Sequence, residues 1–365
     1  MTRLGVAAAL VAGELVAGDV EVADGRVAAV GVRPAGRAGL AVPGFVDVQV
    51  NGFAGVDFLA ADPADHLRAG EALAATGVTT YLPTFITAPA DAYREALRSL
   101  AATPERGPRR LGAHLEGPFL SPAWPGAHPP EHLREPDVGM VDELRALGPV
   151  TTMTVAPELP GGLDLVEALA ARGIVVHLGH TDADAATAHA GFDRGARALT
   201  HVHNAHRRFA ARDPGPAGVA LVRPDVTVTA IVDGVHLAPE TAAGAWLAAR
   251  GRLCLITDAI AAAGRGDGAY RLGSVEVHVA GGVCRLADGR LAGSVVTMDR
   301  AVRELAALGA STAQAVHAAT AAPARLLGRP ELGTLAPGGP ADVTVLDDDL
   351  RVVRTLVAGA EAFAR

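Results

Sequence analysis

The sequence predicts an α/β protein, namely a TIM-like (β/α)8 barrel, with β-rich segments at both chain ends. Three observations lead to this fold class: eight short apolar runs that end in Gly, Pro, Asn or Asp, helical segments between most of them, and strand-like patterns at both chain ends. Strands that alternate with helices pair in parallel, and eight such units close into a barrel. A doubly wound open sheet is the alternative, but no G-x-G-x-x-G follows the first apolar run.

The two chain ends share a β-rich pattern. Residues 18–31 alternate apolar and polar positions around Asp24 and Gly25, which is the pattern of a β-hairpin. Residues 333–359 have the same character. Both ends are therefore β-rich, while the middle of the chain is not.

The β-rich segments cover residues 1–42 and 331–365, and the barrel pattern covers residues 43–330. The apolar run at residues 4–13 is interrupted by Glu14 and continues the strand-like pattern, so we expect a strand there and not a secretory leader.

The barrel elements follow in order along the chain. The predicted strands are the apolar runs at residues 43–52, 77–85, 109–119, 150–158, 173–182, 198–205, 226–237 and 252–259. Helical apolar spacing predicts helices at residues 65–77, 91–102, 164–173 and 240–251.

Catalytic groups in such barrels sit at the carboxyl ends of the strands. The polar side chains at those ends are Gln49, Asn51, Glu116, His180, His201, His203, His236 and Asp258. Imidazoles and a carboxylate gathered around one axis are typical of a metal site with His and carboxylate ligands.

Composition excludes several classes of protein. Half of the 365 residues are hydrophobic and the net charge is −8, so the chain is globular and is not expected to bind nucleic acid or a membrane. A small-molecule partner is expected.

The chain contains no lysine, because all 32 basic residues are arginine. This rules out a Schiff-base lysine, a P-loop lysine and a carboxylated lysine that bridges two metals. Two cysteines cannot make a disulfide framework, so a cytoplasmic location is predicted.

Two residues stand out as metal ligands on local sequence alone. Glu116 ends an apolar run just before Gly117 and Pro118, where helical continuation is blocked, and a buried carboxylate without a cation is costly. His180 follows an apolar run and precedes Thr181, which places it on the predicted barrel rim.

Other residues keep two interpretations. His201 and His203 are two apart and would share a strand face, so either could bind the metal. His177 is expected to be a core histidine, and His114 shares a face with Glu116. Asp258 is either catalytic or a helix cap. The histidines on helical or surface-like segments are expected to be solvated: His66, His132, His189, His278 and His317.

A set of motifs carries a family resemblance. In chain order they are PGFVDVQVNG, HLEGPF, GHTDA, THVHNA, DPGPAG, DGVH and ITDA. From about residue 43 to the end, the chain resembles the N-acetylglucosamine-6-phosphate deacetylases of the amidohydrolase superfamily. Most members of that superfamily begin the barrel with an H-x-H pair that binds a first metal, but Gln49 and Asn51 occupy these positions here. The resemblance therefore implies a single-metal site. It also implies that residues 1–42 and 331–365 form one small β-sandwich domain beside a barrel domain over residues 43–330.

The resemblance also implies roles. Glu116, His180 and His201 would hold one divalent metal, with zinc expected and Fe²⁺, Co²⁺ or Mn²⁺ as alternatives. Asp258 would take a proton from the metal-bound water and pass it to the leaving amine, while His128 would hydrogen-bond the acetamide carbonyl oxygen.

The remaining implied roles concern the sugar phosphate. The implied phosphate-binding groups are Asn204, the backbone of Ala205, Arg212 and His236. In the family this arginine can come from a neighbouring subunit, so a homodimer is expected. One departure from the motifs is His206, which stands where relatives usually have Met.

Two alternatives remain open at this point. One is another amidohydrolase, such as a cyclic-amide hydrolase or a deaminase, which the missing H-x-H pair and missing lysine disfavour. The other is a non-catalytic barrel used as a binding scaffold, which the retained set of Glu, His and Asp residues disfavours.

Overall fold

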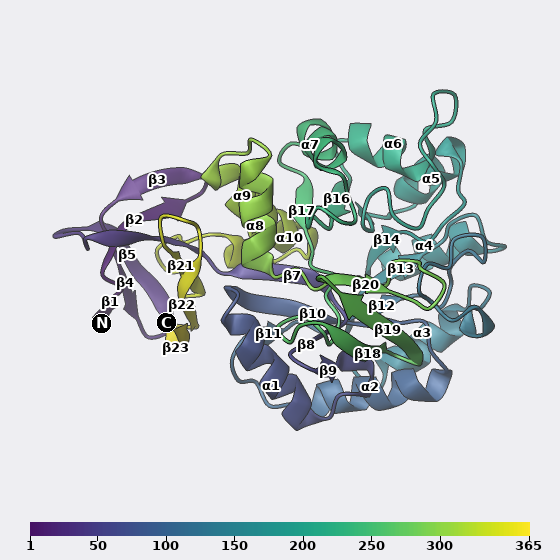
Figure 1. The fold of residues 1–365 in the computed structure, drawn as a ribbon, viewed down its shortest axis with the longest axis horizontal. Coiled ribbons are helices and arrows are strands. Elements are labelled where there is room, and N and C mark those ends of the chain that lie inside the picture. Colours follow the sequence, from purple (N-terminus) through teal and green to yellow (C-terminus); the bar gives the residue numbers. More distant parts are fainter.

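A computed structural model describes all residues, 1–365, and its centre is a parallel barrel (Figure 1). The eight barrel strands, in order around the sheet, are β7 (Phe45–Val50), β10 (Val78–Ile86), β12 (Ala113–Glu116), β13 (Val150–Val155), β14 (Val175–Leu178), β15 (Ala198–Leu199), β16 (Thr227–Ala230) and β17 (Leu253–Leu255). Each neighbouring pair along this order runs parallel. A two-residue strand, β11 (Arg109–Arg110), also pairs with β10. The predicted (β/α)8 barrel is confirmed.

Residues just beyond β17 join the first strand and close the barrel. The N–H of Asp258 donates to the carbonyl of Gln49 at 2.8 Å, and the N–H of Asn51 donates to the carbonyl of Ala259 at 2.8 Å. The ends of the first and eighth strands therefore meet at the same rim.

Helices cover the outside of the barrel. Their bounds are α1 (Pro63–Ala74), α2 (Ala90–Ala102), α3 (Val138–Arg145), α4 (Gly162–Ala171), α5 (Ala185–Asp193), α6 (Gly215–Val222), α7 (Pro239–Ala248), α8 (Met298–Ala307), α9 (Thr312–Ala319) and α10 (Ala321–Leu326). The four helices predicted from periodicity are α1, α2, α4 and α7. In α2, Tyr93 and Leu97 are buried while Glu95 and Arg98 face solvent, which is the one-sided pattern expected of a helix on a sheet. No helix is both long and apolar enough to cross a bilayer.

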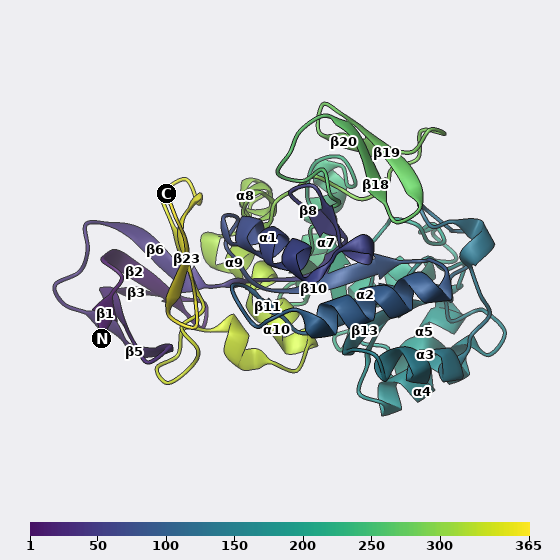
Figure 2. The same ribbon diagram turned by 90° about the horizontal axis from the view of Figure 1, so that it is seen from below.

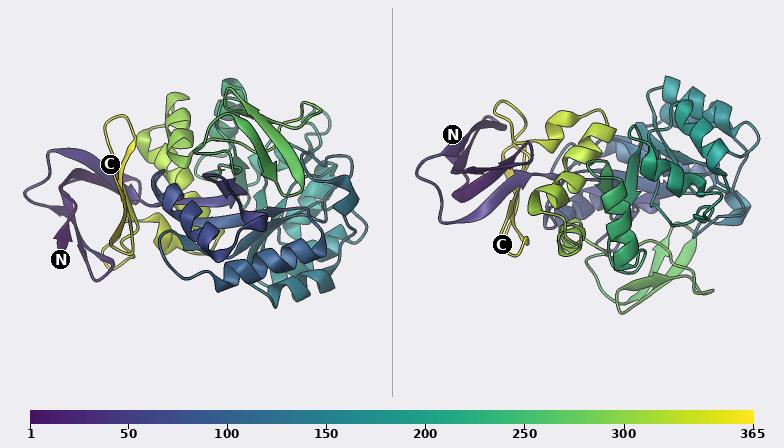
Figure 3. Two further views of the ribbon diagram at one scale, coloured as in Figure 1. Left: turned by 60° about the horizontal axis from the view of Figure 1, so that its bottom comes forward. Right: turned by 90° about the horizontal axis from the view of Figure 1, so that it is seen from above.

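Strands from both chain ends form two further sheets. One has the order β1 (Thr2–Arg3), β4 (Asp19–Ala23), β5 (Arg26–Val32); the other has the order β23 (Ala360–Ala364), β22 (Val352–Val357), β21 (Val343–Leu346), β6 (Ala38–Pro43), β2 (Val6–Val11), β3 (Glu14–Ala17). Because β6 pairs with β21, the second sheet joins the two ends of the chain. An apolar cluster that includes Val20, Val22 and Val343 connects the two sheets. They lie to the left of the barrel in Figures 1 and 3. The exact domain boundaries remain a prediction.

A three-stranded antiparallel sheet was not predicted. It consists of β18 (Gly268–Leu272), β19 (Val275–Ala280) and β20 (Val283–Arg285), and it stands off one side of the barrel in Figure 2. The sequence does contain a signal for it, because Val277 and Val279 are buried while Glu276 and His278 are exposed, which is strand alternation. A short hairpin, β8 (Gly52–Phe53) with β9 (Val56–Asp57), follows the first barrel strand.

Candidate metal centre and active site

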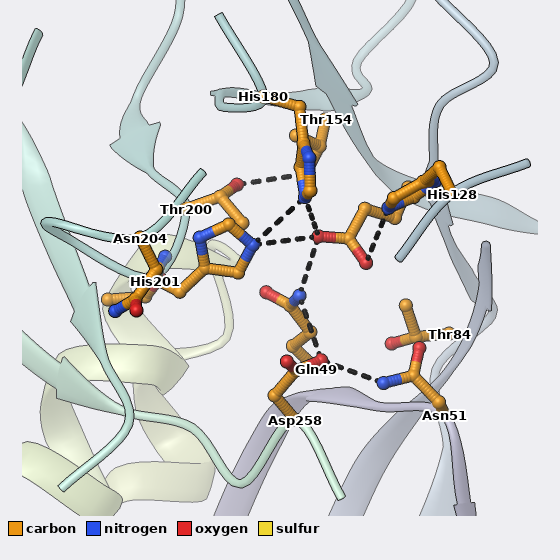
Figure 4. A network of polar contacts seen from close by, with 12 residues as sticks. Gln49, Asn51, Thr84, His128, Thr154, His180, Thr200, His201, Asn204 and Asp258 are labelled. Carbon is orange, nitrogen blue, oxygen red and sulfur yellow. Dashed lines mark hydrogen bonds and ion pairs between the residues drawn. The ribbon is translucent and has the colours of Figure 1, made fainter. Parts of the chain in front are cut away.

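Three predicted ligands meet at one point on the barrel rim (Figure 4). Oε1 of Glu116 lies 3.3 Å from Nε2 of His180 and 3.1 Å from Nε2 of His201, and the two Nε2 atoms lie 3.2 Å apart. All three side chains are buried. Ligand atoms about 2.0–2.2 Å from a tetrahedral zinc ion lie about 3.3–3.6 Å from each other, so this spacing fits a small divalent cation.

The tautomer of His180 also fits a metal. Its Nδ1 lies 2.9 Å from the carbonyl oxygen of Trp124, and since a carbonyl only accepts, Nδ1 carries the hydrogen. The lone pair of Nε2 therefore faces the carboxylate oxygen of Glu116. Burial lowers the pKa of His180 to about 4, so the ring is neutral, as a metal ligand must be.

The charge of Glu116 is held in place by its neighbours. Burial alone would raise the pKa of this carboxyl, but its histidine neighbours, His128 first, outweigh that effect and hold the pKa well below its usual range. For His201, burial alone would lower the pKa of the ring. The hydrogen bond and the charge of Glu116 outweigh burial and raise this pKa above its ordinary value. The site thus offers a fixed negative charge, which a divalent cation would balance.

Backbone geometry, and not strand periodicity, chooses between His201 and His203. Strand β15 ends at Leu199, and His201 and His203 have φ of 28° and 68°, in the left-handed region. The expectation that these two side chains share a strand face is therefore wrong. His201 reaches Glu116, whereas His203 is half-buried and lines a neighbouring cavity.

Gln49 and Asn51 act as hydrogen-bond donors where an H-x-H pair would be. Nε2 of Gln49 lies 2.9 Å from Oε1 of Glu116, and Nδ2 of Asn51 lies 2.7 Å from Oδ1 of Asp258. Because carboxylates only accept, the two amide groups present their NH₂ ends to them. Neutral amide donors thus stand where a first metal would supply positive charge.

Asp258 lies at the end of the eighth strand in a strained conformation, with φ of 48°. The position is held by its neighbours: Oγ1 of Thr257 donates to Asp47 at 2.5 Å, and the N–H of Ser294 donates to the carbonyl of Asp258 at 2.9 Å. Burial and the charge of Glu116 raise the pKa of Asp258 to about 6. A carboxylate with a raised pKa is a better proton acceptor near neutral pH.

His128 is oriented by Thr87, which follows strand β10. Nδ1 of His128 accepts from the N–H of Thr87 at 3.1 Å, so the neutral ring carries its hydrogen on Nε2. That Nε2 lies 3.6 Å from Oε2 of Glu116. His128 therefore presents a donor beside the ligand cluster.

These groups face a cavity of about 400 Å³ at the barrel mouth. Its lining includes Asn51, Glu116, His128, His180, His201, Asn204, Ala205, His236 and Asp258. His236 is fixed by a 2.8 Å contact of Nδ1 with Asp233. The structure thus brings nearly all predicted site residues together.

Arg212 is the exception. It lies on the exposed segment before α6 and does not line this cavity. Arg208, from the same segment, does line it, and so does Arg290, whose guanidinium contacts the carbonyl of Gly126.

Several contributing residues had no local sequence signal. Thr87 and Trp124 act only through the ring that each of them orients, a contact that no periodicity reveals. The expectation that His66 is solvated is wrong: it is buried and stacks on Phe58 at 5.5 Å between ring centroids. His177 is buried as expected, although neither ring nitrogen has a partner.

A barrel with a Glu, His and His cluster at its carboxyl rim is the architecture of a metal-dependent hydrolase. The model of the amidohydrolase family matches residues 40–362. This chain therefore belongs to the amidohydrolase family.

Several similar proteins are named as deacetylases of 6-phosphorylated N-acetyl amino sugars. An N-acetylgalactosamine-6-phosphate deacetylase of Escherichia coli O157:H7 is 39% identical over 351 residues, covering 93% of each chain. An N-acetylglucosamine-6-phosphate deacetylase of Homo sapiens is 40% identical over 338 residues, covering 87% of this chain and 82% of the relative. A Mycobacterium smegmatis N-acetyl-D-glucosamine-6-phosphate deacetylase variant, solved in complex with N-acetyl-D-glucosamine-6-phosphate, superposes with a TM-score of 0.93 at 37% identity over 98% of each chain.

Proposed function

We propose that this enzyme hydrolyses the acetamide of N-acetylglucosamine-6-phosphate to glucosamine-6-phosphate and acetate. The observation that carries the proposal is that Asp258 and His128 flank the Glu116 cluster inside one cavity, which continues to the polar groups of Asn204 and His236. The family membership and the named relatives support the same reaction.

We propose one divalent metal per chain, zinc in the first place, held by Glu116, His180 and His201. The lone pair of His180 Nε2, the charge of Glu116 and the ligand spacing support this assignment. When bound, such an ion acts as a Lewis acid and makes water a stronger nucleophile at neutral pH.

The protein's own groups then move the protons. Asp258 accepts a proton from the attacking water as the new C–O bond forms, and delivers it to the amine nitrogen as the C–N bond breaks. Nε2–H of His128 donates to the carbonyl oxygen while that oxygen gains negative charge. The side chains of Asp258 and His128 are buried, which limits the weakening of these interactions by bulk water.

The sugar phosphate is assigned to Asn204, the backbone N–H of Ala205, His236 and an arginine. Because Arg212 is exposed and outside the cavity of its own chain, we propose that it serves the site of a neighbouring subunit in a homodimer. Arginine suits this task because its planar fork can make two charge-assisted hydrogen bonds to a phosphate.

Changing Arg212 to Ala is expected to lower kcat/KM for the 6-phosphate substrate roughly 10- to 160-fold for each charged hydrogen bond lost. Turnover of unphosphorylated N-acetylglucosamine should barely change. Acetate release is measured for both sugars, with Arg98→Ala, an exposed arginine of α2, as the matched control. Equal loss for both sugars would show that Arg212 does not bind the phosphate.

Metal analysis of the purified protein is expected to give close to one divalent ion per chain. At the position where an H-x-H pair would bind a further metal, Gln49 and Asn51 provide only neutral amide groups. The NH₂ groups of both residues already donate to carboxylates. Two tightly bound ions per chain would contradict the single-metal assignment.

A second candidate substrate is the C4 epimer, N-acetylgalactosamine-6-phosphate, because one relative of 39% identity is named for it. Comparing acetate release from the two 6-phosphates and from free N-acetylglucosamine tests the proposal. A wild type that prefers the unphosphorylated sugar would overturn the substrate assignment.

A cytoplasmic location stays a prediction. The free, buried thiols of Cys254 and Cys284 are consistent with it.

A further inference from the structure

The active-site cavity has an apolar wall beside His128 that the reaction described above does not use. Ile86, Ala127 and Leu272 all line the cavity, and Ile86 and Leu272 are each only 3% exposed. Ile86 is the register partner of Glu116 across strands β10 and β12, and it directly precedes Thr87, which orients His128. The wall therefore lies next to the reacting groups.

Leu272 comes from the antiparallel sheet β18–β20, which is added to the barrel. Its side chain shares one apolar cluster with Ile86, and Ala127 packs against that cluster. A Cβ at the neighbouring Gly273 would lie 3.4 Å from Cδ1 of Ile86, so the turn after β18 sits directly on the barrel.

Two polar contacts hold this sheet over the cavity. The N–H of Gly273 donates to Oδ2 of Asp57 at 2.6 Å, and Arg290, in the segment that follows β20, contacts the carbonyl of Gly126 in the loop that carries His128. Because Gly273 directly follows Leu272 and is tied to Asp57, Leu272 cannot retreat freely from a larger ligand.

The wall lies on the acyl side of the proposed substrate. Figure 4 places Asn204 and His128 on opposite sides of His180, so a sugar held at Asn204 leaves the His128 side for the other substituent of the carbonyl carbon. In an N-acyl amino sugar, that substituent is the acyl chain.

We propose that Leu272, backed by Ile86, limits the length of the N-acyl chain and makes the enzyme selective for acetyl over longer acyl groups. This inference rests on the proposed function and names the part of the chain that restricts its substrates. One methylene in a closed apolar pocket changes kcat/KM by about 10- to 200-fold, so a buried leucine is large enough to enforce the restriction.

The test compares N-acetyl-, N-propionyl- and N-butyryl-glucosamine-6-phosphate, with amine release as the readout. In the wild type, kcat/KM should fall at each added methylene. Leu272→Ala should raise the butyryl-to-acetyl ratio of kcat/KM at least about tenfold, because it removes side-chain volume from the wall. Leu272→Val, which disturbs packing less, should give an intermediate shift.

Val277→Ala is the matched control. Val277 is fully buried in the same apolar cluster and the same sheet, but it does not line the cavity. This variant loosens the sheet without opening the wall, and its acyl ratio should equal that of the wild type.

The inference would be overturned if the butyryl-to-acetyl ratio of kcat/KM is unchanged in both folded Leu272 variants. It would also be overturned if Val277→Ala shifts this ratio equally. If only Leu272→Val folds, the ratio of that variant decides. Failure of the wild type to hydrolyse the acetyl substrate would instead overturn the proposed function. The variants therefore test the inference and the wild type tests the proposed function, so the two outcomes can be distinguished in one experiment.

Discussion

Replacing Asp258 with Asn should lower kcat by about 10²- to 10⁴-fold, the range typical of lost general acid–base catalysis. Asparagine keeps the size of the side chain and can still meet the amide of Asn51, but it cannot accept a proton from water. The metal ligands Glu116, His180 and His201 are untouched, so the metal content should stay at the wild-type level.

The measurement is steady-state acetate release together with metal analysis of the same preparation. Asp349→Asn, an exposed Asp in the loop between β21 and β22, serves as the control for the chemical change alone. Near-normal kcat in Asp258→Asn would make Asp258 a structural residue only.

The pH profile gives a second readout for Asp258. A general base works when it is deprotonated, so activity should fall as the pH drops through its pKa. Burial and the charge of Glu116 raise that pKa to about 6, and a bound divalent cation would pull it down again. The acid limb of kcat/KM is therefore expected at or below pH 6, and it should be absent from the residual activity of Asp258→Asn.

Glu116→Gln should remove both the metal and nearly all activity. Glu116 supplies the only carboxylate of the ligand cluster, and glutamine, although similar in size, brings no charge and is a poor ligand for a divalent ion. The two histidines alone leave an incomplete site.

Chelation provides the parallel experiment on the wild type. A chelator should abolish activity, and one equivalent of zinc should restore it in the wild type but not in Glu116→Gln. Circular dichroism checks that the variant keeps its fold. Retention of both metal and activity by Glu116→Gln would refute the ligand assignment.

The sequence by itself determined the architecture and much of the site. Alternating apolar runs and helical segments are local patterns, so the barrel strands and helices such as α1 and α2 could be predicted from them. Glu116, His180 and Asp258 could be placed at strand ends for the same reason. The β-rich pattern of the two chain ends could be read from the sequence, and their joining was implied by the family resemblance; β6 pairs with β21.

The family resemblance implied the ligand set, but only the tertiary structure shows how its side chains come to meet. The choice of His201 over His203 depends on left-handed backbone turns beyond β15, where strand periodicity no longer applies. The tautomers of His128 and His180 are set by Thr87 and by the carbonyl of Trp124, which are distant in sequence from the rings they orient.

The apolar wall shows the same limit. The alternation in residues 275–280 can predict a strand, but not that its sheet places Leu272 over the cavity or that Asp57 ties it down. Periodicity reports which face of an element is buried, whereas a site is made by contacts between elements far apart along the chain. Those contacts are fixed only when the turns and the closure of the barrel fix the relative positions of the elements.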